Sequence, residues 1–185
     1  MCPPTLHAIE INKYRPTLMR RGRYLREDWG AFSDIGKTYD GVVFTRDEYL
    51  RVEATYLAAI HTMCELASID TLYGHAIEHW HTSDDSLREH QLDDVLDGSP
   101  PVKDGEALTG ARLDNVCRRI LREAAWLELI VPKRFVLHIG WDYRMIFALD
   151  VDPTPLRSWW RELGLYNYTD ARMPNIAREW LGWGQ

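Results

Sequence analysis

The stretch FVLHIGWDYRMIFAL, residues 135–149, decides the fold class. Apolar residues occupy every second position on both sides of its centre, which is the pattern of a strand with one buried face: Phe135, Leu137 and Ile139, then Met145, Phe147 and Leu149. Between the two runs, Gly140-Trp141-Asp142-Tyr143 supplies residues suited to a tight connection. The stretch therefore predicts a β-hairpin.

Two further strands are expected at the ends of the chain. The short apolar run from Leu6 to Ile11 stops at Tyr14-Arg15-Pro16 and predicts a first strand that returns to pair near the hairpin. A last extended segment, Leu165 to Tyr168, is a candidate for one more strand. A third short strand is expected at Val42-Val43-Phe44. We expect a mainly antiparallel sheet built from the N-terminal strand and the C-terminal hairpin.

Helical periodicity fills the middle of the sequence. Thr45-Arg46-Asp47-Glu48 has the pattern of a capping box, in which the Thr hydroxyl and the Glu side chain each bind a free backbone N–H. About five helices are expected: residues 45–67, 68–80, 83–96, a helix beginning at Thr109 with apolar repeats as far as Leu127, and 155–163. Strands at both ends with helices between them predict one α+β domain over residues 1–185, because residues 98–105 are the only linker-like segment.

The connection over residues 15–41 is unusually long for a compact domain, so we expect it to contain a small hairpin or helix, or to be a functional loop. Its first part, residues 15–26, carries five arginines next to Tyr14, Tyr24 and Trp29. Such a mixture could bind single-stranded nucleic acid through phosphate contacts and base stacking. We favour a solvated loop that pairs with the acidic middle of the same chain, residues 47–110.

Composition and motifs argue against several classes of protein. No apolar run is long enough to cross a bilayer, and the N-terminus has no secretory signal pattern. Three scattered cysteines suit a reducing cytosol, and Cys64 and Cys117 fall on apolar helix faces as inert core residues. The nucleophile elbow, the dinucleotide-binding glycines and the phosphate loop are all missing. We therefore expect a cytoplasmic protein that is not an enzyme and holds no cofactor.

Histidines offer one alternative, a metal-dependent hydrolase. His75 and His79 would share a face of the predicted helix 68–80, with His81 close by. The spacing does not match the zinc protease pattern, which needs Glu directly after the first His, or the paired Glu-x-x-His of di-iron bundles. We favour a surface or interhelical histidine cluster over a metal site.

Charge is concentrated in one third of the chain. Residues 1–46 carry 8 basic and 5 acidic side chains, residues 47–110 carry 3 and 14, and residues 111–185 carry 11 and 9. The middle segment, with a net charge of −11, would repel nucleic acid and anionic lipid and attract a basic protein. Its densest part consists of Asp84, Asp85, Glu89, Asp93, Asp94 and Asp97, with Arg88 the single cation among them.

These carboxylates allow two interpretations. On a helix, Asp85 and Glu89 would share a face, as would Glu89 and Asp93, and like charges at this spacing are slightly destabilising. A sequence that keeps such repulsion is consistent with a partner-binding patch, because a negative surface accelerates encounter with a basic one. A merely solvated face is the simpler alternative.

Two segments resemble a known group of proteins. The first is similar to the N-terminal part of small cytosolic bacterial proteins. It consists of Glu27-Asp28-Trp29-Gly30-Ala31-Phe32-Ser33-Asp34-Ile35-Gly36-Lys37, followed by Phe44-Thr45-Arg46-Asp47-Glu48-Tyr49-Leu50. The second segment, in the hairpin, resembles the same proteins: Phe135-Val136-Leu137-His138-Ile139-Gly140-Trp141-Asp142-Tyr143-Arg144-Met145. Proteins of this kind include candidate immunity proteins of polymorphic toxin and contact-dependent inhibition systems. The likeness covers the two ends of the chain and not its acidic middle.

The resemblance implies a function without chemistry. An immunity protein binds one cognate toxin in the cytosol of the producing cell and blocks its active site or its route to substrate. Many such toxins are nucleases with basic clefts, which an acidic patch can occupy in place of nucleic acid. The expected partner is therefore a basic toxin domain, bound by the acidic residues of the middle segment with Trp141 and Tyr143 as aromatic anchors, and neither nucleic acid nor membrane is bound directly.

Overall fold

The computed structural model describes residues 7–20, 23–81, 84–96 and 98–168, apart from the Trp141 side chain. It is an α+β protein with a seven-stranded antiparallel sheet in the order β11-β1-β10-β9-β8-β6-β7. The sheet strands are β1 (His7–Asn12), β6 (Leu72–Trp80), β7 (Ala107–Leu108), β8 (Ala125–Val131), β9 (Phe135–Gly140), β10 (Arg144–Leu149) and β11 (Tyr166–Tyr168).

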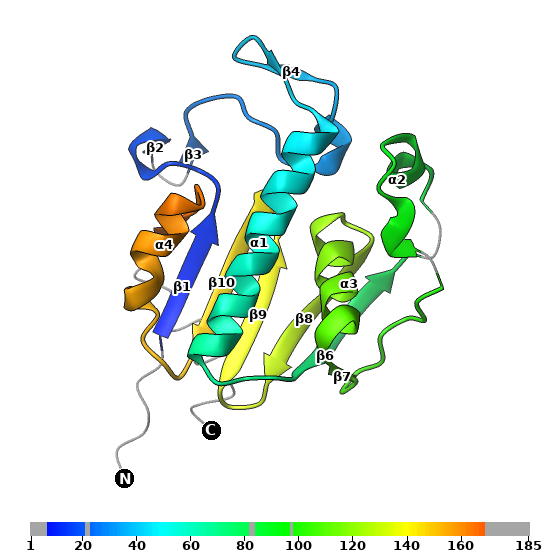
Figure 1. Cartoon of the computed structure of the whole chain (residues 1–185), viewed down its shortest axis with the longest axis vertical. Helices are drawn as coiled ribbons and strands as arrows, with labels where there is room; N and C mark the ends of the chain where they lie inside the picture. Colours follow the sequence, from blue (N-terminus) through cyan, green and yellow to red (C-terminus); the bar gives the residue numbers. More distant parts are fainter. Residues whose placement is uncertain (1–6, 21–22, 82–83, 97, 169–185) are drawn as a thin grey trace.

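The described residues contain four α-helices, where the sequence predicted about five: α1 (Arg46–Leu66), α2 (Asp85–Glu89), α3 (Gly110–Leu121) and α4 (Arg157–Glu162). Helices α1 and α3 lie side by side across one face of the sheet, while α4 lies near β1 at one edge and α2 lies beyond the end of β6 (Figure 1). Short 3-10 turns complete the elements: η1 (Pro16–Leu18), η2 (Phe32–Asp34), η3 (Asp93–Leu96), η4 (Trp141–Tyr143) and η5 (Thr154–Leu156).

The hairpin at the centre of the sheet is confirmed. Strands β9 and β10 pair from Phe135↔Leu149 to Gly140↔Arg144, and η4 forms the turn between them. Strand β1 pairs with β10, and β11 pairs with β1, so both ends of the chain contribute strands as predicted. Phe135 and Phe147 are fully buried beneath α1, with their rings 5.9 Å apart.

Helix α1 begins where the sequence predicted. The Thr45 hydroxyl accepts a hydrogen bond from the Glu48 N–H at 3.2 Å, which satisfies one of the free donors of the first turn. The Glu48 side chain binds Arg51 instead of completing a capping box. The apolar face of α1, including Tyr49, Tyr56 and Met63, is fully buried against the sheet.

Two predicted helical segments are strands, and these predictions are wrong. Residues 72–80 form β6, whose register with β8 shifts between His75 and His79, with Ala76 at a φ of +49°. This bulge removes the strict alternation that identifies a strand and leaves apolar residues at helix-like spacing. The predicted sheet, built from the N-terminal strand and the C-terminal hairpin, therefore lacked β6.

The helix predicted from Thr109 to Leu127 ends at Leu121, and residues 125–131 form β8. Glu123 takes a φ of +55°, and the Ala124 N–H donates to the Arg119 carbonyl, an arrangement that ends a helix. The predicted helix 83–96 is likewise two short pieces, α2 and η3.

The long connection contains two small hairpins. Strands β2 (Met19–Arg20) and β3 (Arg23–Tyr24) pair with each other, as do β4 (Thr38–Tyr39) and β5 (Val42–Val43), so the expectation of an undetected hairpin is confirmed. Tyr14 and Trp29 are buried on the core side of this connection. No described helix is both long and apolar enough to span a membrane.

Candidate partner-binding surface

Five of the six carboxylates in the densest acidic part of the sequence lie on one projecting unit, residues 84–96, which we call the acidic lobe. It follows the last residues of β6 and consists of α2 and η3. Buried Leu87, Leu92 and Val95 join it to the hydrophobic core. The lobe is therefore a packed part of the domain and presents its polar side chains to solvent.

The scaffold holds the lobe mainly through backbone carbonyls. Four side chains outside it donate hydrogen bonds to carbonyls in or next to it: Arg46 to Gln91 (3.0 Å), Asn115 to Val95 (3.2 Å), Arg119 to His81 (2.8 Å) and Arg122 to Leu92 (2.6 Å). These contacts fix the path of the chain without using the side chains of the lobe.

Arg122 is the central contact. Its side chain is 1% exposed and makes a bidentate ion pair with Glu53 of α1, at 2.6 and 2.7 Å, and a further pair with Asp94 of the lobe. Glu53 is itself 4% exposed. A buried pair of this kind holds α1, α3 and the lobe in one arrangement.

The predicted acidic residues have different roles in the structure. Asp84 caps α2 by accepting from the N–H groups of Ser86 and Leu87, and Asp85 pairs with Arg88 at 2.8 Å. Asp94 is bound to Arg122. In the described part of the chain, Glu89 and Asp93 have no ion-pair partner, and Glu89 is exposed. Asp97 lies outside the described residues.

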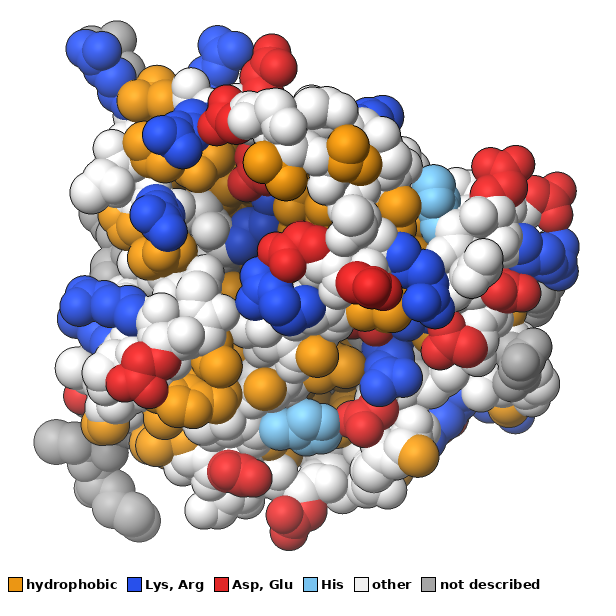
Figure 2. Space-filling view, turned by 45° about the horizontal axis from the view of Figure 1, so that its top comes forward, with side chains coloured by type: hydrophobic (Ala, Val, Ile, Leu, Met, Phe, Trp, Pro, Cys, Tyr) orange, Lys and Arg blue, Asp and Glu red, His pale blue; other side chains and the backbone are white. Residues whose placement is uncertain are grey.

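The lobe is therefore acidic but partly neutralised. Figure 2 shows Asp and Glu side chains gathered on the right of that view, over α2, with Lys and Arg side chains among them. The charges left for a partner are chiefly those of Glu89 and Asp93, together with Asp85, whose side chain is 90% exposed despite its ion pair.

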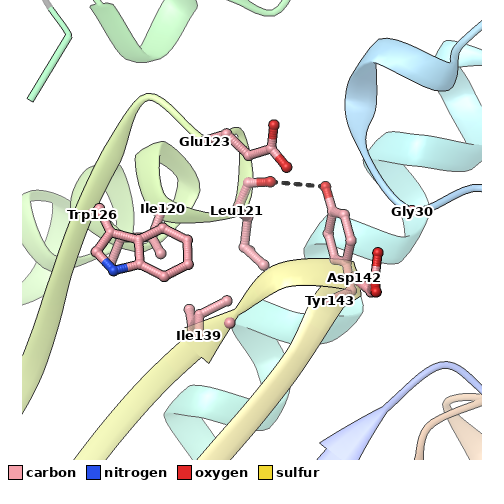
Figure 3. Close-up of a pocket in the computed structure, with 9 residues that line it drawn as sticks. Gly30, Ile120, Leu121, Glu123, Trp126, Ile139, Asp142 and Tyr143 are labelled. Carbon is pink, nitrogen blue, oxygen red and sulfur yellow. Dashed lines mark hydrogen bonds between the residues drawn. The ribbon is translucent and has the colours of Figure 1, made fainter. Parts of the chain in front are cut away.

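A second acidic region lies at the hairpin tip, next to the end of α3. There, a shallow cavity is lined by the apolar residues Ile120, Leu121 and Ile139 and by the carboxylates Glu123 and Asp142 (Figure 3). Glu123 and Asp142 both have left-handed backbone, with φ of +55° and +58°. Glu123 and Asp142 could not be paired from the sequence, because two strands, β8 and β9, separate them along the chain.

Burial raises the pKa of Glu123, and nearby Asp34, Asp142 and Asp84 raise it further. Of these three carboxylates, Asp84 belongs to the acidic lobe and has the smallest influence on Glu123. Gly30 lines the same cavity, and a Cβ there would lie 2.9 Å from the Asp142 Oδ1 atom. The loop at residue 30 and the hairpin tip are thus in close contact.

Glu123→Gln should raise the free energy of unfolding at pH 7. The folded chain binds a proton on Glu123 at higher pH than the unfolded chain does, so the charged form is unfavourable in the fold. The destabilisation by charged Glu123 declines as the pH falls through the pKa of the folded state. It is absent below the pKa of the unfolded state, which is near 4.5. Urea unfolding of both proteins from pH 8 to pH 4 measures this. An equal difference at every pH would contradict the expectation.

Tyr143, predicted to be an aromatic anchor for the partner, is buried and so cannot insert into a partner's surface as it stands. Its side chain is 4% exposed, and its hydroxyl donates to the Leu121 carbonyl at 2.9 Å (Figure 3). Its ring packs against Trp29, Tyr49 and Tyr56. Tyr143 is a core residue that connects the hairpin tip to the end of α3. The side chain of Trp141 lies outside the described residues.

The histidines considered as metal ligands do not converge on one point: His75 and His79 are on strand β6, and His81 follows its end. His75 contacts Asp104 at 3.2 Å, whereas the rings of His79 and His81 lie 4.9 Å apart and His79 stacks near Trp126. A helix would have placed His75 and His79 on one face, but the bulge in β6 separates their environments. Within the described residues, no group of three or more His, Cys, Asp or Glu side chains is arranged to hold a metal ion.

The basic segment 15–26 lies at the other side of the molecule, over the end of β1. Arg15, Arg20 and Arg23 are exposed, and Arg26 lies 3.6 Å from Asp40, a nearby acidic residue. Arg21 lies outside the described residues. The predicted pairing of this segment with the acidic middle of the chain is not found among the described ion pairs.

Comparison with known proteins gave no match: no family model, no curated protein and no solved structure is detectably similar to this chain.

Proposed function

We propose that this protein is an immunity protein that binds a basic toxin domain and blocks it without performing chemistry. The main support is structural: the acidic lobe is rigidly mounted by buried Arg122 and presents Glu89, Asp93 and Asp85 next to a second acidic region at the hairpin tip. The resemblance of the N-terminal segment and the hairpin to candidate immunity proteins is the second support.

The two acidic regions suit a broad, cationic partner surface. The lobe contributes charge at its solvent side, and Glu123 and Asp142 contribute charge at the hairpin tip. Interfaces combine such charged rims with apolar contacts, and the charges chiefly set the association rate. A basic nuclease cleft, which normally holds phosphates, has the required complementarity.

Reversal of three lobe charges tests the proposal. Asp85→Lys, Glu89→Lys and Asp93→Lys together should lower the association rate with a toxin domain taken from a neighbouring gene by at least about tenfold at low salt, because electrostatic steering is lost. Stopped-flow mixing at several salt concentrations measures the rate. The difference should shrink as salt rises.

The control carries the same change in charge elsewhere. Glu65, Asp70 and Glu162 are exposed residues away from the lobe, so their reversal to Lys should change the association rate much less. Both triple variants should keep the thermal stability of the parent within a few degrees, because the exchanged side chains are on the surface. Equal association rates for the two variants, or no binding of the neighbouring toxin by the parent, would refute the proposed function.

A further inference from the structure

Trp80, the last residue of β6, is in contact with two arginines of α3. Arg112 and Arg119 are seven residues apart and so lie on one face of that helix, two turns from each other. Their guanidinium carbons lie over the Trp80 ring, 5.5 and 4.4 Å from its centre. Figure 1 shows α3 lying over β6 and β8.

This cluster has more positive than negative charge. Arg112 binds Glu106, at 3.1 and 3.2 Å, and the Pro100 carbonyl. Arg119 is 0% exposed and binds only neutral groups, the His81 carbonyl and the Asn115 side chain. No carboxylate in the described part of the chain pairs with Arg119. Burial and the neighbouring charge of Arg112 lower the pKa of Arg119.

Three buried N–H donors in the cluster also lack a partner among the described residues: Nη2 of Arg119, Nη1 of Arg112 and Nε1 of Trp80. Unpartnered buried donors are rare in folded proteins because each one loses its hydrogen bonds to water. A buried guanidinium without a counter-charge is still less favourable. All three donors belong to side chains that touch one another through the Trp80 ring.

We propose that Trp80, Arg112 and Arg119 form a binding site for a small oxyanion of the phosphate or sulfate class. Such an ion supplies the missing negative charge and accepts hydrogen bonds from several donors at once, and arginine forks match its geometry. Within the described residues, no carboxylate of the acidic lobe pairs with Arg112 or Arg119; Asp85 and Asp94 pair with Arg88 and Arg122 instead. The site lies at the base of the lobe, because Arg119 also binds His81.

Titration of the wild-type protein with sodium phosphate tests this site directly. The Trp80 indole N–H signal, assigned by its loss in Trp80→Phe, should shift saturably in a ¹H–¹⁵N spectrum as phosphate is added. Sodium chloride at matched ionic strength should shift it much less. A Trp80 signal that responds equally to both salts, or to neither, would overturn the proposal.

Stability provides an independent measurement. Ligand binding to the folded state should raise the Tm of the wild type by about 3–5 °C at ten times the Kd. Arg119→Met should abolish this phosphate-specific rise, whereas Arg161→Met, which removes the same charge from the exposed end of α4, should keep it.

The comparison with Arg161→Met separates binding from the general stabilisation that phosphate gives to any protein. If Arg119→Met is more stable than the wild type at every phosphate concentration, Arg119 is an uncompensated buried charge and the proposal fails. An equal phosphate response in all three proteins would likewise overturn it. Failure of this proposal would leave the proposed function standing, because phosphate binding by the wild type is measured without the toxin.

Discussion

Glu53→Ala should lower the free energy of unfolding by about 3–5 kcal/mol, the loss expected when one partner of a buried ion pair is removed. Glu53 is 4% exposed and neutralises Arg122, which is 1% exposed. After the substitution, Arg122 would retain only Asp94, whose side chain is 59% exposed. The Tm should fall by roughly 6–20 °C for a chain of this size.

The effect should extend to the acidic lobe. Arg122 also donates to the Leu92 carbonyl, so a displaced guanidinium would release the chain at the centre of the lobe. We expect amide hydrogen exchange in residues 84–96 to accelerate more than exchange in β9 and β10. Urea unfolding measures the loss in the global free energy of unfolding, and hydrogen exchange measures how far the lobe itself is destabilised.

Glu48→Ala is the matched control. Glu48 lies on the same helix and also makes a bidentate pair with an arginine, Arg51, at 2.7 and 2.8 Å, but both side chains are largely exposed. Exposed pairs contribute about 0–1 kcal/mol, so this loss should be small. Similar losses in the two variants would show that burial of the Glu53–Arg122 pair has no special importance.

Tyr143→Ala should cost about 3–5 kcal/mol, the usual loss on truncation of a buried aromatic side chain. The ring of Tyr143 is in contact with three other aromatic residues, and its hydroxyl satisfies the carbonyl that ends α3. Because the residue is buried at the hairpin tip, its loss should act on folding. Urea unfolding measures the change.

Tyr143→Phe divides this loss into its parts. Removal of the hydroxyl alone should cost about 1 kcal/mol, since the Leu121 carbonyl keeps a longer contact with the Tyr49 hydroxyl at 3.4 Å. The Phe variant should bind the toxin at the parental rate. A stability loss below about 1 kcal/mol for Tyr143→Ala, together with weaker binding, would instead indicate that Tyr143 acts as an anchor for the partner.

The parts of the fold that the sequence predicted correctly have strong local signals. The hairpin alternates strictly on both sides of a turn, and α1 combines an N-terminal cap with five turns of apolar periodicity. Strands β6 and β8 lacked such signals. A bulge interrupts the alternation in β6, and β8 follows α3 after only three residues, so that its apolar residues continue the helical pattern.

The candidate site was predictable in its location but not in its charge balance. The density of carboxylates in residues 84–97 identified the lobe, and capping by Asp84 followed from its position before α2. Asp94 and Arg122 are 28 residues apart in the sequence, and their pairing depends on how α3 packs. No local sequence pattern encodes that packing. The approach of Asp142 to Glu123 depends in the same way on the sheet.

The attachment of the lobe through main-chain carbonyls has a consequence for specificity. Every residue has a backbone carbonyl, and carbonyls are the groups bound by Arg46, Asn115, Arg119 and Arg122. Most outward side chains between residues 84 and 96 can therefore be exchanged without loss of these four hydrogen bonds. Such a scaffold permits rapid change of partner on an unchanged frame, provided that the apolar anchors remain. Lobe sequences transplanted between related chains should therefore carry recognition with them, and the sheet should fold as before.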